Sequence, residues 1–166
     1  MRIAILSRSW LVPALALLAS CGGEPADVAG TYAISLTNGP NGCELDNWTA
    51  GDTSSGVPVV ITQDGAQVTV TVQDAAAVYL DVTVGSHVFE GTVSGDHIDA
   101  TLTGRAGSLG ACAYTSMVDL DADLDGDVLT GRLRWYARTN GLPDCGRFNT
   151  CENTQQLNGT RPPSGS

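Results

Sequence analysis

Apolar and polar side chains alternate along residues 117–136, with an Asp-Gly pair near the middle. Alternation with a period of two is typical of a strand with one buried face, and Asp-Gly between two such runs predicts a β-hairpin. A two-residue turn at Asp125-Gly126 keeps one face apolar and the other charged, whereas a three-residue turn mixes the faces. The predicted cross-strand pairs are Val118 with Leu133, Leu120 with Gly131, Ala122 with Leu129, Asp119 with Arg132 and Asp121 with Thr130.

Two further segments repeat this design. Residues 57–63 and 67–73 flank Asp64-Gly65, and residues 87–94 and 97–104 flank Gly95-Asp96. With a two-residue turn, the same alternation of side chains places apolar residues opposite one another in both hairpins. The predicted pairs are Val57 with Val72, Val59 with Val70, Ile61 with Val68, Phe89 with Leu102, Gly91 with Ala100 and Val93 with Ile98.

Strands at residues 30–37 and 154–161 complete a set of eight, with the first hairpin extending from about 111 to 138. Residues 74–86 have two interpretations, a loop with a short helical turn or an extra strand at 78–84. Each hairpin has an apolar face that must be covered, and pairing the last strand with the first covers it and removes both sheet edges. We therefore predict an all-β fold, an eight-stranded antiparallel up-and-down barrel.

The cysteines test the strand count. With eight strands, Cys43, Cys112, Cys145 and Cys151 all fall at the barrel end opposite the termini, whereas a ninth strand would separate Cys43 from the other three. The fifth cysteine, Cys21, belongs to the N-terminal segment described below, and the remaining four predict two disulfides if the chain is exported to an oxidising compartment. Extending the strand registers favours Cys112–Cys145 and Cys43–Cys151, and a local Cys145–Cys151 bridge is the alternative.

The N-terminus has the pattern of an export signal. Arg2 and Arg8 precede a short apolar run, which is too short to span a membrane as a helix. The run ends in Leu18-Ala19-Ser20-Cys21, which resembles the lipobox of bacterial lipoproteins. This resemblance implies a signal peptide at 1–20, a lipid on Cys21 and a cell-envelope location, with Gly22 indicating the outer membrane. Residues 21–28 are then the lipidated cysteine and tether, 29–161 the barrel domain and 162–166 a disordered tail.

The net charge of the chain disfavours two classes of binding partner. Without Arg2 and Arg8 the chain has six arginines, no lysine and eighteen acidic residues, a net charge of −12. Nucleic acid and anionic lipid surfaces attract positive charge, so we expect neither as a partner. A cationic protein is compatible with this charge.

A family resemblance rests on the two terminal strands. Gly30-Thr31-Tyr32 opens the first strand and Gly159-Thr160-Arg161 closes the last. This Gly-x-aromatic start and terminal arginine look like the calycin barrels, the lipocalins and their relatives, in which tryptophan occupies the place of Tyr32. The resemblance implies that Tyr32 and Arg161 pack together and close the end of the barrel that carries the termini.

The sequence lacks residues that calcium binding and catalysis would need. Residues 121–127 match the opening of an EF-hand calcium loop, but the twelfth position is Arg132 rather than Glu and both flanks alternate like strands. We therefore predict no metal site and no cofactor. The predicted interior carries no histidine or carboxylate, so we also predict no enzyme and no catalytic residue. That interior comprises Tyr32, Ile34, Val59, Ile61, Val68, Val70, Phe89, Val93, Ile98, Leu102, Leu120, Leu133, Trp135 and Leu157.

Three functional hypotheses follow for an anchored barrel. The first is a binding or structural role in the envelope, with a partner docking on the disulfide-braced loops. The second is a carrier of a small apolar ligand inside the barrel, since eight strands can just enclose one. The third is a module similar to bacterial lipoproteins that inhibit lysozyme, whose cationic target suits an acidic chain. The candidate anchors for docking are Trp48, Leu142, Arg147 and Phe148, because aromatic and arginine side chains dominate interface energies.

Overall fold

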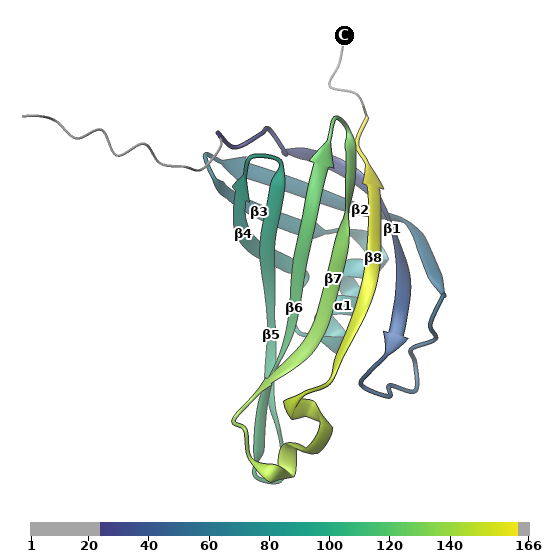
Figure 1. Cartoon of the computed structure of the whole chain (residues 1–166), viewed down its shortest axis with the longest axis vertical. Helices are drawn as coiled ribbons and strands as arrows, with labels where there is room; N and C mark the ends of the chain where they lie inside the picture. The colour runs from purple at the N-terminus through teal and green to yellow at the C-terminus, as the bar shows by residue number, and fades with distance from the viewer. Residues whose placement is uncertain (1–23, 163–166) are drawn as a thin grey trace, which may run out of the picture.

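The protein forms a closed eight-stranded antiparallel barrel in which each strand pairs with its neighbours in sequence and β8 pairs with β1. The computed structural model describes residues 24–162 (Figure 1). Its strands are β1 (Gly30–Asn41), β2 (Thr53–Asp64), β3 (Gln67–Val72), β4 (Val88–Ser94), β5 (His97–Leu109), β6 (Cys112–Asp125), β7 (Val128–Thr139) and β8 (Glu152–Thr160). An α-helix, α1 (Asp74–Thr83), and a 3₁₀ helix, η1 (Pro143–Asn149), lie between strands. The predicted fold class is confirmed.

Two of the three predicted hairpin registers are wrong by two residues. Gly65-Ala66 and Gly126-Asp127 form the turns, so each lies one residue later than predicted and the strand pairing shifts by two. Val59 therefore pairs with Val72, and Asp119 pairs with Arg134 rather than Arg132. A shift of two leaves every side chain on its predicted face, because side chains alternate with that period. The pairs Val93–Ile98 and Gly91–Ala100 around Gly95-Asp96 are confirmed.

All the two-residue turns have glycine at the first central position with positive φ. The values are 59° at Gly65, 61° at Gly95, 59° at Gly110 and 60° at Gly126. Glycine at that position, followed by a residue of ordinary φ, is the pattern of a type II′ turn rather than the type I′ turn assumed from Asp-Gly. The fourth turn, at Gly110-Ala111, ends a long β5–β6 extension that we had expected to be a loop.

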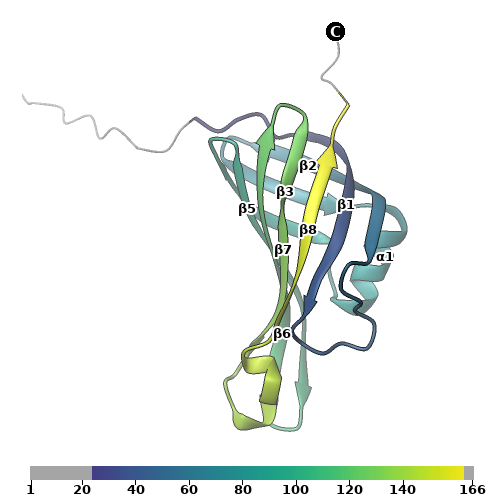
Figure 2. The same ribbon diagram turned by 45° about the vertical axis from the view of Figure 1, so that its right-hand side comes forward.

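Residues 74–83 form a helix, and the extra-strand interpretation is wrong. The alternation of Val78, Leu80, Val82 and Val84 suggested a strand, yet only Leu80 and Val84 are buried. These two residues are four apart and so lie on one helical face. Figure 2 shows α1 packed beside the barrel near the end remote from the termini.

The end that carries the termini is closed by a cluster around Tyr32 and Arg161. The Arg161 guanidinium lies 5.9 Å from the Tyr32 ring centroid, as the family resemblance implied. The Tyr32 hydroxyl donates to the Val28 carbonyl at 2.9 Å, and Val28 is fully buried. Ala26 donates its N–H to the carbonyl of Gly95 at 2.7 Å. The segment from residue 26 onward, which we had assigned to the tether, is therefore part of the packed domain.

The opposite end is braced by two disulfides, Cys43–Cys151 and Cys112–Cys145. This is the pairing favoured from the strand registers, and the local Cys145–Cys151 alternative is wrong. Figure 1 shows β5, β6 and β7 continuing past the barrel toward η1 at this end. The Cys43–Cys151 bridge joins the β1–β2 loop to the start of β8, while the second bridge joins η1 to the start of β6.

The predicted signal peptide (1–20), the lipidation site Cys21 and residues 163–166 of the predicted tail lie outside the described residues. Within residues 24–162, no helix has the length and apolar character needed to cross a membrane.

Candidate functional site

An apolar chamber occupies the barrel interior at the disulfide-braced end. Its volume is about 190 Å³. Every predicted interior residue is buried or packs against the core, and most of them line this space. The lining residues are Ile34, Leu36, Ser54, Val57, Val59, Ile61, Val70, Val72, Ala76, Tyr79, Leu80, Phe89, Leu120, Leu129, Leu133, Trp135, Gln155 and Leu157.

The chamber does not come from the interior glycines. Small interior residues can either free space or let the barrel wall pack closely, and none of Gly91, Ala100, Ala122 and Gly131 lines the chamber. A Cβ added at Gly91 would lie 2.6 Å from the Cβ of Ala100, and one at Gly131 would lie 2.6 Å from the Cβ of Ala122. These glycines therefore allow close packing of neighbouring side chains across the strands, and the unfilled volume lies elsewhere in the barrel.

The helix α1 roofs the chamber on one side. Ala76 and Leu80 line the space from the helix, and the methyl side chain of Ala76 fills little of it. Asp81 anchors the helix from outside, since its carboxylate lies 2.7 Å from Nδ1 of His87 and its carbonyl accepts from Arg105 at 3.3 Å. The exposed residues Val78 and Val82 project outward from the same helix.

Polar groups at the chamber are few, and most are already hydrogen-bonded. The Trp135 indole N–H donates to Oε1 of Gln155 at 2.9 Å, and Nε2 of Gln155 donates to Oδ1 of Asn38 at 2.8 Å. Ser54 and Tyr79 are exposed, which places them at the rim where the chamber reaches the surface. A space with this lining favours an apolar occupant, because a polar ligand would lose its hydrogen bonds to water without replacement.

The four predicted anchors do not form one surface. Phe148 stacks on Tyr114 with 6.0 Å between ring centroids and is half-buried. Arg147 forms an ion pair with Glu44, which links η1 to the β1–β2 loop. The half-buried Trp48 donates its indole N–H to the Gly39 carbonyl at 2.9 Å. Three of the four side chains therefore hold the loops together, and the side chain of the fourth, Leu142, is 43% exposed.

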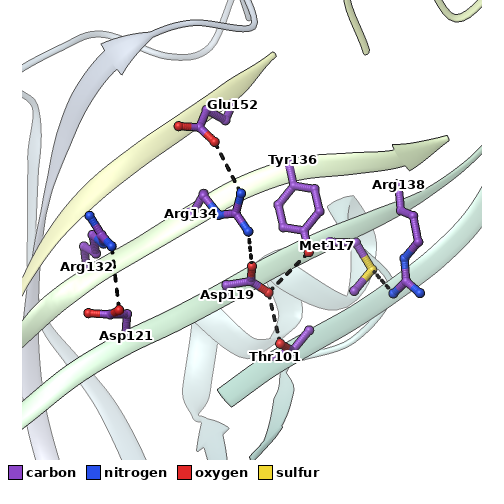
Figure 3. A network of polar contacts seen from close by, with 9 residues as sticks. All are labelled: Thr101, Met117, Asp119, Asp121, Arg132, Arg134, Tyr136, Arg138 and Glu152. Atoms are coloured by element: carbon purple, nitrogen blue, oxygen red, sulfur yellow. Dashed lines mark hydrogen bonds and ion pairs between the residues drawn. The ribbon is translucent and has the colours of Figure 1, made fainter. Parts of the chain in front are cut away.

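A charged network covers the outer wall of the barrel (Figure 3). Asp119 accepts hydrogen bonds from Arg134 at 2.6 Å, Thr101 at 3.0 Å and Tyr136 at 3.4 Å. Arg134 also pairs with Glu152 at 3.5 Å. Burial and the neighbouring Asp119 carboxylate raise the pKa of the Tyr136 phenol. In this network Arg134 pairs with the carboxylates of Asp119 and Glu152, on the strand face opposite to the one that lines the chamber.

The EF-hand-like residues belong to the same outer face. Asp121 pairs with Arg132 at 3.6 Å, and Asp123 lies 2.8 Å from Nδ1 of His97. Across residues 24–162, no group of three or more histidine, cysteine, aspartate or glutamate side chains is arranged to hold a metal ion. The aspartates therefore act as a solvated strand face with cross-strand ion pairs.

Comparison of the chain with protein-family models, with curated protein sequences and with solved structures finds no match.

Proposed function

We propose that this protein binds a small apolar ligand in the barrel chamber. The observation that carries the proposal is an apolar space of about 190 Å³ that reaches the surface beside α1. A cavity of about 150 Å³ lined by leucine, isoleucine and phenylalanine stays dry and binds benzene. A ligand of about six to eight carbons fits the chamber on that scale. At about 0.8 kcal/mol per buried methylene, such a ligand binds with a dissociation constant of tens of micromolar or weaker.

Two matched variants on α1 test this proposal. Residues 24–162 contain the whole closed barrel, so the chain without residues 1–21 is the protein to use. Toluene titrated into it is expected to release heat and raise the melting temperature. Ala76→Phe extends a ring into the chamber and is expected to weaken toluene binding at least tenfold. Ala75→Phe, on the exposed face of the same helix, is expected to leave it unchanged. Failure of the wild-type protein to bind toluene would refute the proposal.

We further infer that the barrel is exported and anchored through lipid on Cys21. The pattern of residues 1–21 supports this inference, and so does the presence of two disulfides, which persist in oxidising compartments. Expression of the full chain in a bacterium with labelled palmitate is expected to label the protein. Cys21→Ser is expected to abolish the label and release the protein from the membrane fraction. Label retained in the Cys21→Ser variant would contradict the assignment.

Docking of a partner at the tip formed by η1 and the β5–β6 turn is a second candidate. Leu109, which precedes the β5–β6 turn, is 52% exposed, and Leu142, which precedes η1, is 43% exposed. Asp144 accepts from the Ala111 N–H at 3.3 Å, which fixes one segment against the other. Lysozyme inhibition is the first activity to measure, and Leu142→Asp is expected to weaken it. No inhibition at micromolar concentration would count against a lysozyme-inhibitor role.

A further inference from the structure

A second apolar space lies just beyond the chamber, along the extension toward the disulfides. This groove also has a volume of about 190 Å³. Val118, Ser116 and Tyr114, which share one face of β6, line it. Its lining residues are Cys43, Leu45, Val84, Tyr114, Ser116, Met117, Val118, Trp135, Tyr136, Ala137, Phe148, Cys151 and Asn153.

Trp135 is the side chain shared by the two spaces. It lines both the chamber and the groove. It is only half-buried, although it is the largest apolar side chain of the interior. Its one polar contact among the described residues is the indole hydrogen bond to Gln155, and Gln155 is held in turn by Asn38 of β1.

The two spaces also adjoin along the helix α1 and the residue that follows it. Leu80 lines the chamber and Val84, one helical turn later, lines the groove. Residues four apart on a helix are direct neighbours, so the apolar surface is continuous from one space to the other. Trp135 is therefore a partition across a single elongated interior.

We propose that the chamber and the groove are two halves of one site for a linear alkyl chain, and that Trp135 swings aside to admit it. The inference rests on the proposed function and names the ligand class. Moving Trp135 breaks one neutral hydrogen bond, which weakens binding about two- to thirteenfold. Each methylene buried strengthens binding about fourfold. Two methylenes beyond the partition therefore offset the movement, and the joined site holds a chain of about twelve carbons.

A chain-length series tests the joined site. The probes are n-alkan-1-ols from hexanol to dodecanol, titrated into the chain without residues 1–21. A joined site is expected to gain about fourfold in affinity per methylene up to octanol, little over the next two methylenes while Trp135 is displaced, and about fourfold per methylene again to dodecanol. A closed chamber would stop gaining at about eight carbons. In a Trp48→Phe background Trp135 is the remaining tryptophan of this chain, and its emission is expected to shift further with probes longer than octanol than with hexanol.

A groove-blocking variant gives the matched control. Ala137 lines the groove but not the chamber. Ala137→Trp is therefore expected to remove the gain in affinity for alcohols longer than octanol and to leave hexanol binding unchanged. Ala113→Trp, on the exposed face of the neighbouring strand β6, is expected to change neither. Melting curves verify that both variants are folded, and the wild-type series stands without them. Hexanol binding with a plateau at octanol would overturn the joined site alone, whereas no binding of hexanol would overturn the proposed function with it.

Discussion

The guanidinium of Arg161, at the end of the last strand, lies 5.9 Å from the ring centroid of Tyr32 in the first strand. Its Nε donates to Asp127 at 2.9 Å, and its NH1 donates to the carbonyls of Ala29 at 2.8 Å and Asp27 at 3.1 Å. Burial raises the pKa of the Tyr32 phenol, and the Arg161 charge partly opposes that shift. One side chain thus joins the first strand, the last strand and the β6–β7 turn.

Arg161→Ala is expected to lower the free energy of unfolding by about 2 kcal/mol, because it removes a cation–π contact and several charge-assisted hydrogen bonds together. Arg161→Lys is expected to recover less than half of that loss, since an ammonium cannot reproduce the planar fork. Urea unfolding measures both changes. Arg132→Ala, which removes an exposed ion pair on the same barrel, is the control and is expected to cost less than about 0.5 kcal/mol. Equal losses for Arg161→Ala and Arg132→Ala would contradict the role of Arg161 at the closed end.

The pairing of His97 with Asp123 predicts a small pH dependence of the free energy of unfolding. Its hydrogen bond to Asp123, with further attraction from Asp121 and Asp99, raises the pKa of His97 above 6.5. Folding then favours the charged form, so the added stability is full below about pH 6.5 and is lost as the pH rises through the folded pKa. Both side chains are exposed, which limits the effect to well under 1 kcal/mol. An NMR titration, assigned with His97→Gln, is expected to give a pKa above 6.5, and a value at or below 6.5 would refute the pairing.

The two disulfides are expected to contribute unequally. Cys43–Cys151 spans 108 residues and Cys112–Cys145 spans 33. Loop-closure entropy grows with the logarithm of that span, so losing the longer bridge is expected to cost about 0.5 to 1 kcal/mol more than losing the shorter one. Urea unfolding of the two paired Cys→Ser variants measures this difference. A larger loss for Cys112→Ser with Cys145→Ser would show that local packing outweighs chain entropy.

The turn at Gly65-Ala66 allows a test of its backbone conformation. Gly65 has a φ of 59°, and no atom lies within 4 Å of a Cβ built there. Gly65→Ala therefore carries only a backbone penalty, expected to be about 1 kcal/mol. Ala66→Gly is expected to cost a few tenths of that amount, because Ala66 has ordinary φ. The reverse ranking in thermal unfolding would contradict the placement of Gly65, with positive φ, and Ala66, with ordinary φ, at the two central positions.

The sequence predicted the barrel and the cysteine pairing because both depend on parity. A register shift of two residues misplaces Asp119 against Arg132 without moving either side chain to the other face. The alternation of side chains also predicted that Leu133 and Trp135 face the interior, which the structure confirms. Turn type was not determined by the sequence pattern, because Asp-Gly is compatible with glycine at either central position.

The chamber could not be predicted, because an unfilled volume depends on how far apart the elements pack. Residues 78–84 alternate like a strand, so the sequence left a helical turn and an extra strand as alternatives, and the structure has a helix in which Leu80 is buried, with the buried Val84 directly after it. The position of Ala76 over the interior follows from that helix. The double role of Trp135 was hidden for the same reason, since the groove depends on how far β6 and β7 extend past the barrel.

The most direct measurement is a crystal structure of the chain without residues 1–21 soaked with iodobenzene, located by anomalous scattering of iodine. Our account predicts a peak inside the barrel, in contact with Phe89, Leu120 and Trp135. A barrel that stays empty at a saturating concentration, or a peak found only on the outer surface, would contradict the assignment of the chamber as the ligand site.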